Sequence, residues 1–409
     1  NYDYMYGNYS PTIQSLVQND FNIRDTHVNS IDFTSTADGG VLFRTDRYGI
    51  NVHKNLTVTP GNAYIGDPNP LAPTDSTKNL NKRFNIVMLA NGTVNHADTV
   101  VPKVKNTGII TINAGGQNVI GLMAYNGGRA ESTGDITVTN SDDSIGMVIS
   151  GTNSSNKISS GTSSSNIKLK GTRVTGIYNN GTDYVMTGGS VKVEGQDSMG
   201  IYASNVGTTL ATTKLQNGTI SAEGTGAVAL YARGGSDIEL NNTTLSIGNG
   251  GLLFYGAGTA SDKSQLIMTG ADSNATIANG GTAFYVKNAS GSPLSALISS
   301  ASTKTLNLNM QSGSTLMVAE GSGGNVGGEL VSNLSSLGTG SVTGLNITGT
   351  PGTYVPYKAT RVPLTVDVNS NLDNPGDAYL KSEFSSSSVT NNAAISGSGA
   401  ITTPTSLKD

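Results

Sequence analysis

The chain has 409 residues, a formal net charge of −4 at pH 7 and no cysteine. So small a net charge, without a basic stripe, argues against nucleic acid as a partner, because little is available to neutralise a row of phosphates. The lack of cysteine excludes disulfide bonds and thiol chemistry. Hydrophobic residues make up only 35 % of the chain and glycine occurs 53 times, which favours a thin repeated core over two or three ordinary domains.

Residues 1–30 do not share the pattern of the rest and are predicted to form an N-terminal cap or an irregular segment. Four tyrosines gather near its start: Tyr2, Tyr4, Tyr6 and Tyr9. They fit either an edge that covers the first coil or a surface that binds sugars or proteins. From Ile31 onwards, apolar residues recur in pairs separated by one residue, which is the period of a strand with one buried face.

A proline-rich segment at 60–81 interrupts this pattern. Four prolines occur within it, and prolines are not accommodated inside a parallel sheet. Because loops longer than about 12–15 residues are usually functional or disordered, we expect an excursion loop that binds a partner, with a plain spacer as the alternative. The polar and aromatic side chains predicted to make the contacts are Tyr64, Asp67, Asn69 and Asp75.

Residues 187–204 contain the clearest repeat unit, two short strand patterns joined by a turn. In the first pattern Val191 and Val193 alternate with the polar Lys192 and Glu194. The apolar pair recurs at intervals of roughly 24–31 residues, a range typical of solenoids, propellers and arrays. Its copies are Ile110/Ile112, Ile136/Val138, Ile167/Leu169, Val191/Val193, Ile220/Ala222 and Leu245/Ile247.

A second strand pattern keeps step with the first and ends in an aromatic residue. Its copies are Gly176-Ile177-Tyr178, Gly200-Ile201-Tyr202, Ala229-Leu230-Tyr231, Leu253-Phe254-Tyr255 and Ala283-Phe284-Tyr285. The recurrent tyrosines are expected to stack ring on ring at a corner of the coil, with a sugar-binding ladder as the alternative.

The period and the composition together indicate a parallel β-helix. Helical repeats would show apolar residues three and four apart over ten or more positions, and none does. A propeller blade needs four strands and roughly 40 residues. Asn-Gly pairs between the strands supply the positive φ of tight turns. We therefore predict an all-β, right-handed parallel β-helix with coils of about 25 residues over 31–350, its hand taken from the bias of parallel connections.

Two more segments are predicted to depart from the regular coils. Residues 151–166 are rich in Ser, Thr, Asn and Gly and are expected to form a flexible excursion loop. In 351–409 the prolines return and are followed by Ser, Thr and Asn, which indicates irregular or degenerate coils, or a coil cut part-way.

No catalytic residue, metal site or cofactor site is predicted. The three histidines are far apart in the sequence and lack metal-ligand spacing. Asp142 and Asp143 are the best carboxylate pair, but neighbours on a strand face opposite ways, so we expect them to be solvated in a turn. Glu194 and Glu223 are expected to sit near Lys192 and Lys170 in the stack and to relieve surface charge. A polysaccharide-degrading β-helix enzyme is kept as the less favoured alternative.

The repeat units resemble a known family. The pattern Gly-x-Ile-x-Val, as in residues 134–138, followed by Ser-x-Gly-Ile-Tyr, as in residues 198–202, is similar to the passenger repeats of very large type V autotransporter adhesins of oral anaerobic Gram-negative bacteria. The resemblance covers roughly residues 100–290 well and the rest loosely. It implies a right-handed parallel β-helix, and it does not identify any binding residue on this chain.

The resemblance also implies a location and a set of partners. The passenger would be displayed at the cell surface, anchored by an outer-membrane β-barrel of the same polypeptide outside this sequence. The implied function is adhesion to a host-cell protein receptor, to a galactose-type glycan or to other bacteria. Three alternatives stay open: a binder of an inhibitory immune receptor through loop contacts, an inert stalk, and the enzyme named above. The chain begins without methionine, and we expect it to be an internal or processed piece of a larger protein.

Overall fold

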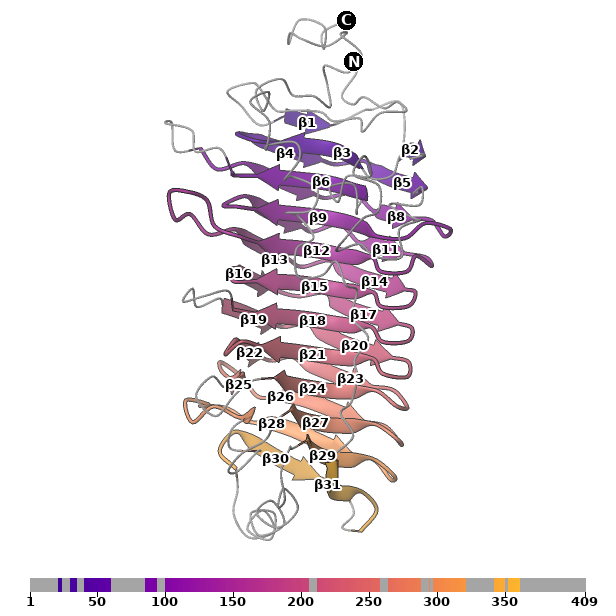
Figure 1. Ribbon diagram of the computed structural model, residues 1–409, viewed down its shortest axis with the longest axis vertical. Coiled ribbons are helices and arrows are strands. Elements are labelled where there is room, and N and C mark those ends of the chain that lie inside the picture. Colours follow the sequence, from indigo (N-terminus) through magenta and orange to yellow (C-terminus); the bar gives the residue numbers. More distant parts are fainter. Residues whose placement is uncertain are drawn as a thin grey trace, which may run out of the picture. The chain divides into compact units, whose positions relative to one another are not determined.

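The computed structural model describes residues 21–23, 30–34, 40–59, 85–93, 100–205, 212–257, 264–287, 294, 297–320, 342–349 and 352–360. These residues fall into two compact units. The first unit takes in 21–161 and 169–174, and the second unit takes in 162–168 and 175–360. Both units are built almost wholly from short strands (Figure 1).

The first unit is a parallel β-helix in which successive coils add strands to three sheets. Sheet A pairs β3 (Gly40–Thr45), β6 (Asn85–Asn91), β9 (Val119–Tyr125) and β12 (Ile145–Ser150) in that order. Sheet B pairs β1 (Phe21–Ile23), β4 (Gly49–Val52), β7 (Lys103–Asn106) and β10 (Arg129–Ser132). Sheet C pairs β2 (Ser30–Thr34), β5 (Asn55–Thr59), β8 (Ile110–Ile112) and β11 (Ile136–Val138).

The second unit has the same three-sheet plan. Its sheet A pairs β15 (Thr175–Asn180), β18 (Met199–Ser204), β21 (Val228–Arg233), β24 (Leu252–Ala257), β27 (Thr282–Lys287), β29 (Thr315–Glu320) and β31 (Val355–Thr360). Its sheet B pairs β16 (Asp183–Met186), β19 (Thr212–Gln216), β22 (Asp237–Asn241) and β25 (Gln265–Met268). Its sheet C pairs β17 (Ser190–Glu194), β20 (Thr219–Glu223), β23 (Thr244–Ile247), β26 (Ser273–Ile277), β28 (Leu306–Met310) and β30 (Leu345–Thr348). Strands β13 (Ser160–Ser163) and β14 (Asn166–Lys170) contain the boundary between the units.

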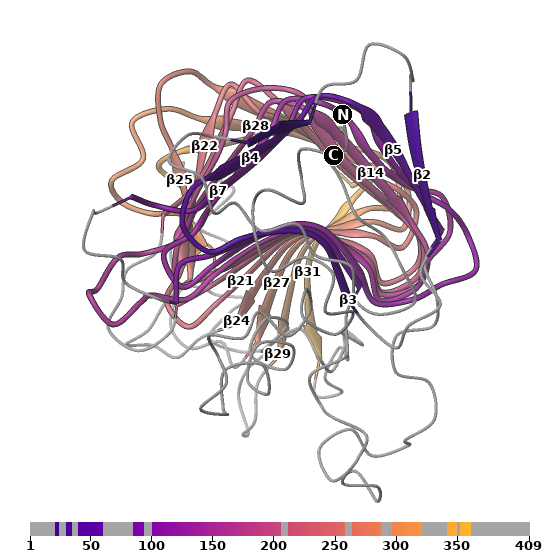
Figure 2. The same cartoon turned by 90° about the horizontal axis from the view of Figure 1, so that it is seen from above.

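The sheets enclose the core of each unit. Seen from above, the strands of one sheet lie behind one another and form a wall (Figure 2). In the first unit, β3 marks the wall of sheet A, β4 and β7 mark that of sheet B, and β5 marks that of sheet C. Within sheet C the pairing is in register, with Ile110 opposite Ile136 in the first unit and Val191 opposite Ile220 in the second. All four side chains are buried. Each such burial stabilises the fold by about 1.5–3 kcal/mol, so equivalent positions build an apolar ladder.

The predicted parallel β-helix is confirmed. The apolar pairs identified in the sequence lie on the inner face of sheet C, and the pattern ending in tyrosine forms strands of sheet A. The turns also follow the sequence, since Asn126 and Asn217 adopt positive φ of 46° and 55°. A coil contributes three strands rather than the two that the repeat indicated, because it also carries a strand of sheet B, such as β7 or β10.

The predicted departures from the coils have mixed outcomes. Residues 151–166, expected to be a flexible loop, contain a bridge between Thr152 and Ile158, the strand β13 and the first residue of β14. In the expected N-terminal cap, β1 already pairs in parallel with β4. In the expected degenerate C-terminal segment, β31 pairs with β29 in register. The predicted loop 60–81 and the segment 361–409 lie outside the described residues.

Candidate binding surface

The residues predicted to bind a partner are not placed by the structure. Tyr64, Asp67, Asn69 and Asp75 all lie outside the described residues. Their role in recognition therefore stays a prediction, and a candidate surface has to be sought among the described strands and corners.

The recurrent tyrosines form one continuous stack on sheet A of the second unit. Neighbouring ring centroids lie 4.7–5.2 Å apart with planes within 18° of parallel. At one end the Tyr285 hydroxyl donates a hydrogen bond of 2.7 Å to the buried Glu320 carboxylate. The members of the stack are Tyr178, Tyr202, Tyr231, Tyr255 and Tyr285. The predicted stacking is confirmed, although the rings lie within strands and not at a corner of the coil.

These rings lie on the face of sheet A opposite the core, yet four of them are buried. Asn179 donates a hydrogen bond to Thr213, which is itself an inner residue of β19, so the neighbouring Tyr178 faces the other way. Even so, Tyr178, Tyr202, Tyr255 and Tyr285 are at most 3 % exposed. A sugar needs an open ring face for stacking, so the ladder acts as packing and does not serve as the candidate surface.

The two carboxylate pairs considered in the sequence also have structural partners. Arg173 forms a bidentate ion pair with Asp143, with distances of 2.7 and 2.9 Å, and Asp142 accepts a hydrogen bond from the Thr172 backbone. The expectation that both aspartates are solvated is wrong for Asp143, which is buried at a positive φ of 55°. This pairing ties the turn before β12 to the turn after β14, and it leaves no pair of free carboxylates.

Glu194 and Glu223 lie directly opposite each other in sheet C of the second unit. The Lys192 ammonium bridges them at 2.8 and 3.1 Å, and Lys168, not the expected Lys170, approaches Glu194 at 3.5 Å. Two cations thus face two carboxylates, and such exposed pairs contribute little to stability. The predicted charge relief is confirmed, except that Lys168 takes the place expected for Lys170.

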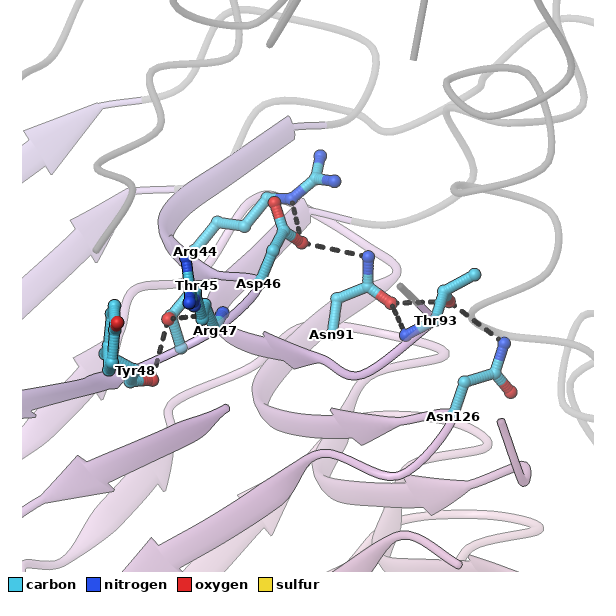
Figure 3. A network of polar contacts seen from close by, with 8 residues as sticks. All are labelled: Arg44, Thr45, Asp46, Arg47, Tyr48, Asn91, Thr93 and Asn126. Carbon is cyan, nitrogen blue, oxygen red and sulfur yellow. Dashed lines mark hydrogen bonds and ion pairs between the residues drawn. The ribbon is translucent and has the colours of Figure 1, made fainter. Parts of the chain in front are cut away.

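A ladder of polar contacts runs along the corner that follows sheet A in the first unit (Figure 3). Asp46 Oδ1 accepts hydrogen bonds from Arg44 Nε at 3.1 Å and from Asn91 Nδ2 at 2.9 Å. Asn91 Oδ1 accepts from the Thr93 backbone and hydroxyl, and Thr93 Oγ1 accepts from Asn126 Nδ2 at 3.1 Å. The contacts connect three successive coils and tie this corner together from Asp46 to Asn126.

Beside this corner, the outer face of sheet B carries an excess of positive charge. Lys103 and Lys105 alternate along β7 with the buried Val104 and Asn106, so both lysines face outwards. On β10, Arg129 lies opposite Lys103 and Glu131 lies opposite Lys105. We call Lys103, Lys105, Arg129 and Glu131 the basic face.

One carboxylate is shared between the two lysines of the basic face. Glu131 forms ion pairs with both: its Oε2 lies 2.7 Å from Lys103 Nζ, and its Oε1 lies 2.8 Å from Lys105 Nζ. Partial burial acts to raise the pKa of Glu131, but hydrogen bonds from both ammonium groups outweigh it and hold the pKa below its ordinary value of 4.5. Arg129 is exposed. Three cations against one carboxylate leave an excess of two positive charges.

The lowered pKa of Glu131 predicts a pH dependence of stability. A carboxyl group whose pKa is lower when folded stabilises the fold fully above its unfolded value, and the contribution is lost as pH falls through the folded value. We expect the melting temperatures of the native protein and of Glu131→Gln to differ at neutral pH and to converge below pH 4.5. Calorimetry on both proteins measures this, and a gap that widens on acidification would contradict the assignment.

Sequence reasoning missed the basic face because it missed the strands that carry it. The segments KVKN at 103–106 and RAES at 129–132 contain few apolar residues. A usable signal was nevertheless present, because both segments precede an apolar pair of sheet C by the same number of positions. Aligning the coils on Ile110 and Ile136 places Lys103 beside Arg129 and Lys105 beside Glu131.

Among the described residues, no three His, Asp or Glu side chains gather closely enough to bind a metal ion. In the same part of the chain, no helix combines the length and the apolar character needed to span a membrane. Comparison of the chain with protein-family models, with curated proteins and with solved structures finds no match.

Proposed function

We propose that the chain is a non-enzymatic adhesive segment displayed at the cell surface, a passenger of the autotransporter type that binds host-cell receptors or glycans. The observation that carries this proposal is the basic face on the first unit. Its charged side chains contribute nothing to the apolar core, yet they lie on two strands paired in register, and hydrogen bonds tie three successive coils together at the neighbouring corner. A preorganised polar surface on a repetitive scaffold is suited to recognition, because the scaffold adds no entropy cost when a partner binds.

The β-helix itself supports the same proposal. Its coils are stabilised by contacts with neighbouring coils only, so outward side chains can vary without disturbing the fold. Flat outer faces of parallel sheet offer side chains at regular spacings to an extended partner. An inert stalk is the second candidate, and the buried tyrosine stack favours it because that stack serves packing alone.

The test is binding of the purified 409-residue protein to host cells, with and without excess galactose or N-acetylgalactosamine. The proposal predicts saturable binding. Inhibition by the free sugars would assign the contact to a galactose-type glycan, and binding that survives them would assign it to a protein receptor or to another glycan. A heat-unfolded sample of the same protein is the control for adhesion that does not depend on the fold.

Two outcomes would overturn the proposal. Absence of saturable binding to any host or bacterial cell would leave the stalk. Release of oligosaccharides from acidic polysaccharides by the purified protein would favour the enzyme, and should then be lost on unfolding.

A further inference from the structure

The charge of the basic face differs from that of two other charged clusters among the described residues. The cluster on sheet C of the second unit is balanced, with Lys168 and Lys192 against Glu194 and Glu223. On sheet B of the second unit the balance is acidic, since Lys214 faces Glu239 at 3.7 Å while Asp237 lies on the same strand. The basic face keeps its excess of two positive charges within a chain whose formal charge is −4.

We propose that the basic face binds acidic glycans through their sulfate or carboxylate groups, held by Lys103, Lys105 and Arg129. This inference rests on the proposed adhesive function and names the chemistry of its ligand. The ammonium group has three N–H donors and the guanidinium group has five, so each side chain keeps donors for a ligand beyond those used within the protein. Charge-assisted hydrogen bonds from such donors to oxyanions are about twice as strong as neutral ones.

The sheet sets the spacing of these cations. Lys103 and Arg129 are direct partners on neighbouring strands, so their Cα atoms lie roughly 5 Å apart, while Lys103 and Lys105 are two residues apart along one strand, at roughly 7 Å. On the other side of Lys103 the partner residue is Gly49, which has no side chain. Gly49 is itself buried, so a ligand has access to the part of the face over β7 and β10, where Arg129 is exposed and Lys103 and Lys105 are partly exposed.

The same features argue against other classes of ligand. A protein partner would need apolar or aromatic anchors at the centre of its contact, and the outward positions of β7 and β10 hold only charged or polar side chains. Nucleic-acid binding commonly uses about 6–10 phosphate contacts, more than three cations provide. A glycan that carries a few sulfate or carboxylate groups matches this small number of cations.

The first experiment titrates the purified protein with heparin as the sulfated probe and polysialic acid as the carboxylated probe, with neutral dextran as the control. Calorimetry at low and high salt gives the affinities. We expect both acidic probes to bind, with affinity falling steadily as salt rises, and dextran not to bind. The stronger of the two probes identifies whether sulfate or carboxylate is the better ligand. Binding of neither acidic probe, or equal binding of dextran, would overturn the proposal.

Matched variants locate the site. Lys103→Gln combined with Arg129→Gln should weaken heparin binding by roughly tenfold or more, as expected for losing two charge-assisted contacts. Lys168→Gln combined with Lys192→Gln changes the net charge equally but should leave binding within about twofold, because those lysines face carboxylates. Equal losses in both double variants would show attraction to charge alone and refute the assignment.

A third variant tests whether the ligand is negatively charged. Glu131→Gln removes the carboxylate that competes for Lys103 and Lys105, so it should bind heparin more tightly than the native protein. Weaker binding by a variant with unchanged circular dichroism at the assay temperature would contradict an anionic ligand.

The remaining outcomes separate this inference from the proposed function and from a rival occupant. Cell adhesion without binding of either acidic probe would reject the acidic glycan while the adhesive function stands. Binding of an acidic probe without cell adhesion would reject the adhesive function while the glycan site stands. A second copy of the chain could use its acidic Asp237 and Glu239 as the partner instead. Sedimentation that shows self-association at low salt, lost in the Lys103 and Arg129 double variant while heparin binding persists, would establish that occupant and overturn the proposal.

Discussion

Replacing Tyr202 by alanine is expected to destabilise the second unit by roughly 3–5 kcal/mol, the usual result of truncating a large buried aromatic side chain. Tyr202 is 2 % exposed and stacks on Tyr178 at 4.9 Å and on Tyr231 at 5.2 Å. The loss of both stacking contacts adds about 0.5–1.5 kcal/mol for each pair. The melting temperature should fall by several degrees, and amide exchange should rise first in β15, β18 and β21, because a coil in a solenoid depends on its immediate neighbours.

The control is Tyr202→Phe, which keeps the ring in the stack and should lose no more than the ~0.5–1.5 kcal/mol of a typical hydrogen bond. Because long repeat arrays need not unfold in one step, the exchange pattern is a better measure than a single free energy. Binding to cells for each folded molecule should be unchanged in both variants. A Tyr202→Ala protein with native stability and lost binding would return the tyrosine ladder to the list of recognition surfaces.

The parts of the fold that could be predicted are those in which buried and exposed positions differ in chemistry. Val191 and Val193 alternate with Lys192 and Glu194, and the structure buries the valines on the inner face of sheet C. Sheet B escaped prediction because its inner positions include small or polar residues. Ser132 is fully buried on β10 beside Ala130, and the alternation of apolar and polar residues that marks a strand is then lost.

The polar composition of 151–166 hides the strand β13 in the same way. Ser163 is buried, and its hydroxyl is hydrogen-bonded at 2.6 Å to the buried Tyr184 hydroxyl one coil later. A buried hydroxyl is acceptable when it is paired, and the pairing partner becomes visible only after the coils are aligned.

The basic face, too, becomes visible only after the coils are aligned. Lys103 and Arg129 are separated in the sequence, and only the register of sheet B makes them neighbours. The sequence alone shows which residues are charged. It does not show the local excess of positive charge, because the net charge averages over the whole chain. The contact residues expected on the excursion loop, Tyr64 among them, were chosen from composition and stay a prediction.

Replacing Gly134 by alanine is expected to destabilise the first unit by at least the ~1–3 kcal/mol typical of overpacking. Gly134 lies in the turn between β10 and β11, stacked on Gly108 of the preceding coil. A Cβ atom at Gly134 would lie 1.9 Å from the Gly108 carbonyl oxygen, and a Cβ atom at Gly108 would lie 2.1 Å from the Lys54 carbonyl oxygen. Both obstacles are backbone atoms held by the ladder, so the coils would have to separate locally.

Gly188→Ala is the matched control, because Gly188 also lies in a turn between sheets B and C, with no obstacle closer than the Asn217 carbonyl oxygen at 3.9 Å. Alanine restricts the unfolded chain more than glycine does, so this variant should be neutral or stabilised by about 0.4–1 kcal/mol. The two substitutions are chemically identical, yet Gly134→Ala should lower the melting temperature while Gly188→Ala should leave it unchanged or raise it. Similar small shifts for both would mean that neighbouring coils can move apart at the turns between sheets B and C at little cost, and would contradict the close backbone packing of Gly134 on Gly108.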